Sequence, residues 1–197
     1  TTGNVLMMFN KQEFLQTIRN DRRRKVLPIM TSPGMELTGA APREVFQSGE
    51  LQFRCIQALA EAAPVDAQVT FMDLSVEAEA FGREIVFSDH ENPTVAAALA
   101  DTEEKIRALQ IPAVGTRRTA EVLSCAKLCA EHLERPTFGG LIGPYSLAGR
   151  LADMTEMMIL AAAEPETAHL LLRKTTDFLK EYIRAFKATG VAGVMIA

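Results

Sequence analysis

Hydrophobic positions along the chain fall into short continuous runs separated by longer segments in which they recur every three or four residues. The continuous runs predict buried strands at 26–30, 68–72, 137–142 and 193–197. The periodic segments predict helices at 10–19, capped by Asn10, at 42–62 with an interruption near Ser48 and Gly49, at 116–132, at 147–163 and at 166–188. A helical turn is expected at 76–81, closed by Gly82, and a short extra strand at 84–87.

Strands that alternate with helical segments of ten or more residues are typical of βαβ units, which form a parallel sheet. A closed barrel of eight such units typically needs about 250 residues. Four core strands in 197 residues are half of that number. We therefore expect an α/β fold: a (β/α)8 TIM barrel truncated to about its first half, with residues 1–197 as a single domain. Pro28 is the weak point of the first strand, because proline cannot donate to a strand ladder.

The composition of the chain limits the kinds of molecule that it is expected to bind. The chain is 48% hydrophobic and carries a formal net charge of −4, so we expect no nucleic-acid partner, which would require a basic surface. No apolar run approaches the roughly 18 residues of a membrane span, and no secretory signal is evident, so no membrane association is expected. Three cysteines give no disulfide framework and fit a cytoplasmic protein.

Three segments resemble one enzyme superfamily. They are MDLSVEAEAFG at 72–82, GGLIGPYSLAG at 139–149 and GVAGVMIA at 190–197. In order and spacing they are similar to motifs of the uroporphyrinogen decarboxylase and cobalamin-dependent methyltransferase superfamily. The resemblance extends over nearly the whole chain and implies the barrel type of that superfamily.

Two departures separate the branches of the superfamily. True uroporphyrinogen decarboxylases have a Met-Arg-Gln-Ala-Gly-Arg segment after the first strand, whereas residues 30–35 read MTSPGM, without arginine. A tyrosine of that family falls at Arg150. Because a tetrapyrrole with eight carboxylates needs fixed cationic donors, we favour the methyltransferase branch. The alternatives are a uroporphyrinogen decarboxylase and a non-catalytic truncated barrel.

The favoured branch implies transfer of a methyl group between a corrinoid (methylcobalamin) carried by a partner protein and a small-molecule thiol acceptor such as coenzyme M. It also implies a zinc ion that binds the acceptor as a thiolate. Its zinc ligands, a His-x-Cys pair and a later Cys, belong to the second half of the barrel, so no metal site is expected in this chain. This stretch alone is expected to be inactive, and association into a homo-oligomer is left open.

Barrel active sites form where strands end, which selects 31–35, 73–79 and 144–150. The candidate binding residues are Asp73, Glu77, Tyr145, Ser146 and Arg150; no catalytic residue is assigned. Four of them have a structural alternative: a helix cap for Asp73 and for Ser146, packing against the barrel rim for Tyr145, and a surface ion pair for Arg150. Glu77 and Glu79 are two apart and cannot share a helical face, and Glu77 is the one expected to point inward. Cys125, Cys129 and His132 share a helical face. We expect no metal binding there, because buried cysteines usually act as small apolar side chains.

Overall fold

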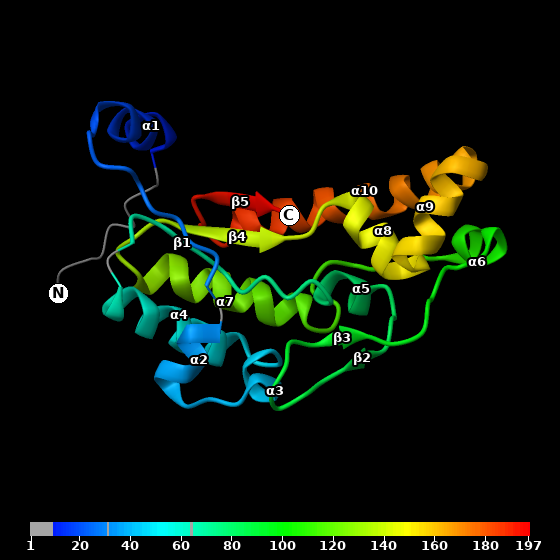
Figure 1. Ribbon diagram of the computed structural model, residues 1–197. Helices are drawn as coiled ribbons and strands as arrows, with labels where there is room; N and C mark the ends of the chain where they lie inside the picture. Colours follow the sequence, from blue (N-terminus) through cyan, green and yellow to red (C-terminus); the bar gives the residue numbers. More distant parts are fainter. Residues whose placement is uncertain (1–9, 31, 64) are drawn as a thin grey trace.

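The computed structural model describes residues 10–30, 32–63 and 65–197, and Figure 1 shows the arrangement of its elements. The helices are α1 (Lys11–Asn20), α2 (Ser32–Thr38), α3 (Pro42–Val45), α4 (Gly49–Ala62), α5 (Val76–Ala80), α6 (Glu103–Ala108), α7 (Thr119–His132), α8 (Pro144–Ala152), α9 (Met154–Ala163) and α10 (Pro165–Ala188). The strands are β1 (Gln68–Val69), β2 (Ile85–Val86), β3 (Thr94–Val95), β4 (Thr137–Leu141) and β5 (Gly193–Ile196).

The main sheet has three parallel strands in the order β1-β4-β5. Its strands therefore follow one another in chain order, without the reversal that a doubly wound sheet shows at its switch point. Parallel neighbours in chain order, each connected through a helix, are what a stretch of a (β/α) barrel contains. The separate β2–β3 pair is antiparallel and lies within the connection from β1 to β4.

Helices pack on the sheet according to their position in the chain. α7 contacts β4, α10 contacts β5, and α4 packs along α7. The inward stripe of α10 places Phe178, Tyr182 and Phe186 in the core, each no more than 1% exposed, with neighbouring ring centroids 5.8 and 4.7 Å apart. These apolar faces account for most of the folding driving force, since burying each large side chain contributes about 1.5–3 kcal/mol.

The two adjacent glycines of β4 allow close packing on both faces of the strand. A Cβ on Gly139 would lie 2.4 Å from the Phe186 ring, and one on Gly140 would lie 2.4 Å from the Met72 side chain. Successive strand residues point to opposite faces, so the pair admits a helix on one side and a neighbouring side chain on the other. The glycine-rich motif at 139–149 is thus in part a packing requirement.

Most predicted elements are confirmed. The parallel strands at 68–72, 137–142 and 193–197 correspond to β1, β4 and β5, although β1 is only two residues long. Asn10 caps α1 by accepting from Gln12 N and Glu13 N, and Gly82 ends the α5 turn with φ of 103°. The extra strand at 84–87 is β2, with β3 as its partner.

The predicted strand at 26–30 is wrong. The Val26 carbonyl accepts from Asp66 N at 3.0 Å, but the described segment joins no strand ladder. Pro28 has no N–H to donate, which is the physical reason why the apolar run packs without pairing. Thr31, which follows it, lies outside the described residues.

Three other boundaries differ from expectation. The helix predicted from Thr116 begins at Thr119, and the helix predicted at 147–163 starts earlier and is broken at Asp153, whose φ is 87°. Helices α2 and α6 were not predicted, because each is too short to show a period.

Lys174 on α10 binds the end of α6. Its Nζ donates to the carbonyls of Ile106, Arg107 and Leu109 at 2.8, 2.8 and 2.6 Å, where α6 leaves its last carbonyls unpaired. Lys174→Met should lower the free energy of unfolding by about 2 kcal/mol, since hydrogen bonds to a charged donor are worth about 1.5–3 kcal/mol. Urea unfolding measures this change.

The matched control is Lys180→Met, which removes an exposed lysine from the same helix, paired only with Asp177. It should cost less than about 0.5 kcal/mol. Equal losses for the two variants would show that the α6 contact contributes nothing.

Candidate functional site

The strands of the main sheet end at one side, which we call the mouth: the residues that follow β1 and β4 together with α5 and α8. Figure 1 shows α5 and α8 beyond the arrowheads of β4 and β5. Ile142, directly after β4, donates its N–H to Glu77 Oε1 on α5 at 3.2 Å, so these two segments meet here. The sequence-predicted residues lie on these segments, as the barrel rule requires.

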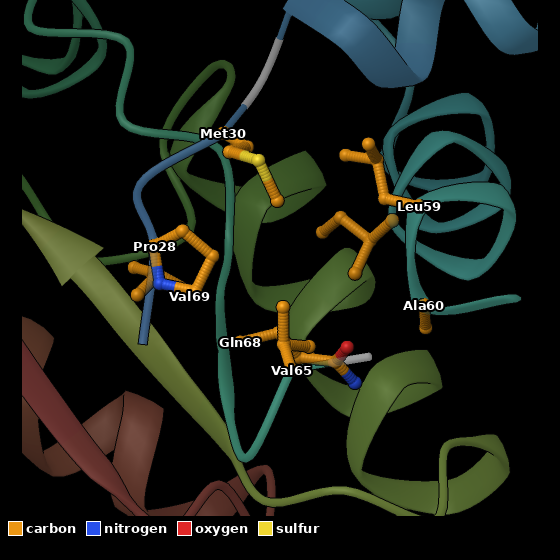
Figure 2. Close-up of a pocket in the computed structure, with 8 residues that line it drawn as sticks. Pro28, Met30, Leu59, Ala60, Val65, Gln68 and Val69 are labelled. Carbon is orange, nitrogen blue, oxygen red and sulfur yellow. The ribbon is translucent and has the colours of Figure 1, made fainter. Parts of the chain in front are cut away.

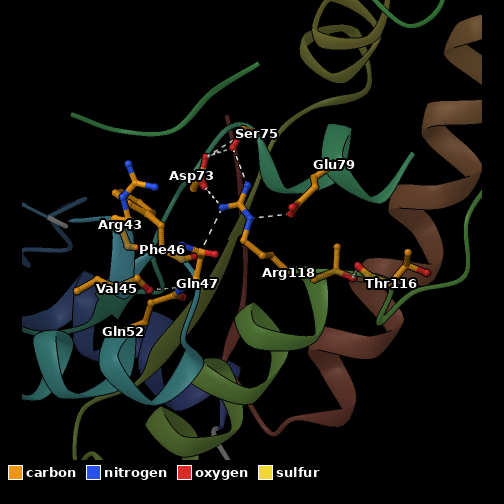
Figure 3. A network of polar contacts seen from close by, with 11 residues as sticks. Arg43, Val45, Phe46, Gln47, Gln52, Asp73, Ser75, Glu79, Thr116 and Arg118 are labelled. Carbon is orange, nitrogen blue, oxygen red and sulfur yellow. Dashed lines mark hydrogen bonds and ion pairs between the residues drawn. The ribbon is translucent and has the colours of Figure 1, made fainter. Parts of the chain in front are cut away.

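A buried arginine organises the β1 side of the mouth (Figure 3). The Arg118 side chain is 7% exposed and ion-pairs with both Asp73 Oδ2 and Glu79 Oε2, the latter at 2.6 Å. Its remaining contacts are the Ser75 hydroxyl at 2.9 Å, the Phe46 carbonyl at 3.4 Å and the face of the Phe87 ring, 4.8 Å from its centroid. Arg118 thus joins four chain segments.

The turn before α7 delivers Arg118 into this position. Gly115 and Arg117 adopt φ of 90° and 51°, and Thr119 Oγ1 accepts from Gly115 N while donating to Thr116 O. This turn starts α7 three residues later than predicted and directs Arg118 inward. No sequence pattern pointed to Arg118, because a Thr-Arg-Arg stretch before a helix has the pattern of a solvated connector.

Asp73 does not cap α5, whose N-cap is Ser75 and has no side-chain cap hydrogen bond. Its Oδ1 accepts from Ser75 N at 2.9 Å and from Ser75 Oγ at 2.6 Å, which fixes the turn into α5, while Oδ2 binds Arg118. Its side chain is 4% exposed. Asp73 is therefore a fixed, hydrogen-bonded carboxylate that orients Arg118 and Ser75, with both oxygens already engaged.

Glu77 and Glu79 point to different partners, as their spacing requires, but both are buried. Glu77 is the more enclosed at 2% exposure, and its Oε2 has no hydrogen-bond partner among the described residues. Burial raises the pKa of Glu77 to about 7, against the hydrogen bond from Ile142, and the nearby charge of Asp73 adds to the rise. Glu77 is therefore a carboxyl that holds its proton near neutral pH.

Tyr182 on α10 belongs to the same buried cluster. Its hydroxyl is fully enclosed without a hydrogen-bond partner among the described residues. Burial raises the pKa of Tyr182 well above its usual value, and the charge of Glu77 acts in the same direction. The phenol accordingly stays neutral.

The three candidates on α8 have different surroundings. Tyr145 is 41% exposed at the mouth, and its side chain forms no hydrogen bond within the described residues, so neither packing at the rim nor contact with a ligand is decided for it. Ser146 does not cap α8, because Gly143 is the N-cap and Pro144 the first helical residue, so that structural alternative is wrong. Arg150 is half-buried, and its side chain forms no hydrogen bond or ion pair within the described residues, so the surface ion pair considered for it does not form.

The cysteine and histidine side chains of α7 do not converge. Cys125 and Cys129 are buried with Sγ atoms 4.0 Å apart, whereas His132 is exposed and stacks on Phe53. Within residues 10–30, 32–63 and 65–197, no group of three His, Cys, Asp or Glu side chains could hold a metal ion. The zinc implied by the resemblance thus has no site among these side chains. In the same part of the chain, no helix is long and apolar enough to cross a membrane.

A small cavity of about 20 Å³ lies at the opposite end of β1 (Figure 2). Its lining is apolar apart from Gln68 and comes from the 26–30 segment, α4 and β1: Pro28, Met30, Ile56, Leu59, Ala60, Val65, Gln68 and Val69. It has room for about one water molecule, so it is a packing defect rather than a ligand site.

Glu77 should make stability depend on pH. Its pKa is about 7 in the folded chain against a model value of 4.5, so the neutral form stabilises the fold fully below about pH 4.5, and this contribution is lost as pH rises to 7. The shift corresponds to about 3 kcal/mol as an order of magnitude. Glu77→Gln should remove the decline between pH 4.5 and 7, measured by urea unfolding at each pH.

Glu61→Gln on α4, which removes an exposed carboxylate, is the control and should keep the decline. If Glu77→Gln keeps it as well, the neutral carboxyl is not the cause.

Comparisons with known proteins agree on one family. The model of the family described as uroporphyrinogen decarboxylase (URO-D) matches residues 11–197. The uroporphyrinogen decarboxylase of Legionella pneumophila (strain Paris) is 33% identical over 144 residues, covering 67% of this chain and 39% of that protein. That of Hahella chejuensis (strain KCTC 2396) is 28% identical, covering 69% and 40%. The chain thus spans about two fifths of the length of these curated relatives.

A solved structure described as a methyltransferase from Methanosarcina mazei superposes with a TM-score of 0.80 at 22% identity, covering 94% of this chain and 58% of that one. At this identity the likeness shows the fold, and it confirms the predicted α/β class and barrel type. The sequence motifs, the chain-ordered parallel sheet and these matches lead to one conclusion: the chain belongs to the uroporphyrinogen decarboxylase (URO-D) family.

Proposed function

We propose that the protein to which this chain belongs is a methyltransferase that moves a methyl group between a corrinoid and a small thiol-type acceptor. The observation that supports this choice within the family is the charge balance on the β1 side of the mouth. Asp73, Glu77 and Glu79 contribute three carboxyl groups, and Arg118 is the guanidinium in contact with them.

A substrate with eight carboxylates is poorly matched to this side of the mouth. Arg118 already donates to four protein acceptors, so it has little capacity left for a ligand. Bringing further carboxylates beside Asp73 and Glu79 would place like charges together in a region shielded from water, where repulsion is strong. A small acceptor avoids this cost.

The reaction requires little acid–base chemistry from these residues. The acceptor thiol loses its proton to solvent, and the resulting thiolate sulfur attacks the methyl carbon. The sulfur–carbon bond forms as the bond to the donor breaks, and both electrons of the broken bond remain on the donor. Fixed groups serve such a transfer by positioning the reactants and excluding water. The buried network around Arg118 is suited to holding the mouth rigid. The corrinoid protein as methyl donor and zinc as activator of the thiol belong to the same proposal.

Uroporphyrinogen decarboxylation is the second candidate, because relatives with that name share up to 33% identity with this chain. It would need cationic groups other than Arg118 to bind the substrate carboxylates.

One assay on the full-length protein separates the two. With methylcobalamin and 2-mercaptoethanesulfonate, we expect loss of the methylcobalamin absorbance and a methyl thioether detectable by mass spectrometry. With uroporphyrinogen, we expect no coproporphyrinogen by chromatography. Coproporphyrinogen formation without methyl transfer would reverse the choice.

A further inference from the structure

Two arginines at the α8 side of the mouth lack the counter-ions that buried guanidinium groups normally have. Arg83 follows α5 and is 5% exposed; its Nη2 donates to the Ala96 carbonyl at 2.6 Å, but its Nε and Nη1 have no partner among the described residues. The Arg150 side chain on α8 is half-buried and forms no hydrogen bond or ion pair within the described part of the chain. An unpaired buried donor costs about 1–3 kcal/mol, and more when it is charged.

These two side chains belong to one region. α5 packs against α8, and the segment that receives the Arg83 hydrogen bond continues to Leu99 and Ala100, whose N–H groups both donate to the Leu151 carbonyl, next to Arg150. Burial lowers the pKa of Arg83, and the charge of Arg150 contributes in the same direction. The packing of α5 on α8 and the hydrogen bonds at Leu151 thus place Arg83 and Arg150 in the same region of the mouth.

The acidic group whose charge acts on Arg83 is already engaged in a helix cap. Asp153 raises the pKa of Arg83, but it is exposed and its Oδ1 caps α9 by accepting from Thr155 N at 2.8 Å. A solvated, capping carboxylate screens two guanidinium groups only weakly. The arrangement thus has a surplus of positive charge and unused N–H donors beside the carboxylate-rich β1 side.

We propose that Arg150 and Arg83 form an anion-binding subsite that receives the acidic group of the methyl acceptor. Arg150, which reaches the surface, makes the direct contact, and the buried Arg83 reinforces the positive potential beneath it. The ligand chemistry is an oxyanion: a sulfonate, phosphate or carboxylate. A guanidinium fork presents paired N–H donors that match two oxygens of such a group. That the oxyanion belongs to a methyl acceptor rests on the proposed function; that the subsite binds an oxyanion does not.

The first experiment needs no activity. Inorganic sulfate is titrated into the full-length protein by calorimetry at constant ionic strength, with Arg150→Gln as the variant. Sulfate should bind the unsubstituted protein, and Arg150→Gln should weaken binding about 10- to 100-fold, the loss expected for a charge-assisted contact. Arg83→Gln, which keeps a donor for the Ala96 carbonyl, should weaken it about 3- to 10-fold, provided that its circular dichroism is unchanged. Arg135→Gln, which removes an exposed arginine just before β4 at the far end of the strand, should bind as the unsubstituted protein does.

The second experiment identifies the source of the oxyanion. The ratio of kcat/KM for 2-mercaptoethanesulfonate to that for the neutral 2-mercaptoethanol is measured with methylcobalamin. Arg150→Gln should lower this ratio about 10- to 100-fold, whereas Arg135→Gln should leave it unchanged.

The outcomes separate the two claims. Absence of sulfate binding, or equal binding by Arg150→Gln, overturns the subsite. Sulfate binding with an unchanged acceptor ratio retains an anion site for free anions and overturns its role in the acceptor. Failure to methylate either thiol counts against the proposed function, while the titration still decides the subsite.

Discussion

The mouth of this partial barrel depends on one buried guanidinium. Arg118 binds Asp73 from the end of β1, Glu79 from α5, Ser75 between them and the Phe46 carbonyl before α4, and it lies over the Phe87 ring. These groups come from segments that are far apart in the sequence. A charge so deeply enclosed costs free energy unless it is paired, and the contacts that satisfy Arg118 also fix the relative positions of the segments.

This constraint explains how charge is distributed at the mouth. On the β1 side, Arg118 already forms ion pairs with Asp73 and Glu79. Burial raises the pKa of Glu77 to about 7, because it disfavours the charged form of the carboxyl group. On the α8 side, Arg83 and Arg150 remain without carboxylate partners in the described chain. The site thus combines an acidic, rigid side with a basic side whose guanidinium N–H donors are in part without partners in the described chain. That asymmetry fits a small acceptor with one acidic group better than a molecule that is acidic all round.

Sequence patterns predicted the features that depend on one segment at a time. Continuous apolar runs identified β4 and β5, and the rule that barrel sites follow strand ends identified Asp73 and the α5 and α8 segments. The run at 26–30 failed because strand formation needs backbone donors as well as apolar side chains, and Pro28 removes one. Arg118 was missed because its importance comes from partners 39 and 45 residues earlier in the chain, which no local pattern reveals. The two-residue spacing of Glu77 and Glu79 correctly implied different directions, but not that both would be buried, with Glu79 paired to Arg118.

The most direct test of the central role of Arg118 is a double-mutant cycle with Asp73, in which Arg118→Leu, Asp73→Leu and the double variant are compared by urea unfolding. The cycle isolates the coupling between the two side chains from the effects of each substitution alone. We expect a coupling free energy of about 2–3 kcal/mol, because Arg118→Leu leaves the buried Asp73 carboxylate without its guanidinium and the double variant removes that carboxylate as well. Glu79 loses its partner in both variants that lack Arg118, so this cost cancels in the cycle. A coupling below about 0.5 kcal/mol would contradict the claim that this ion pair holds the mouth together.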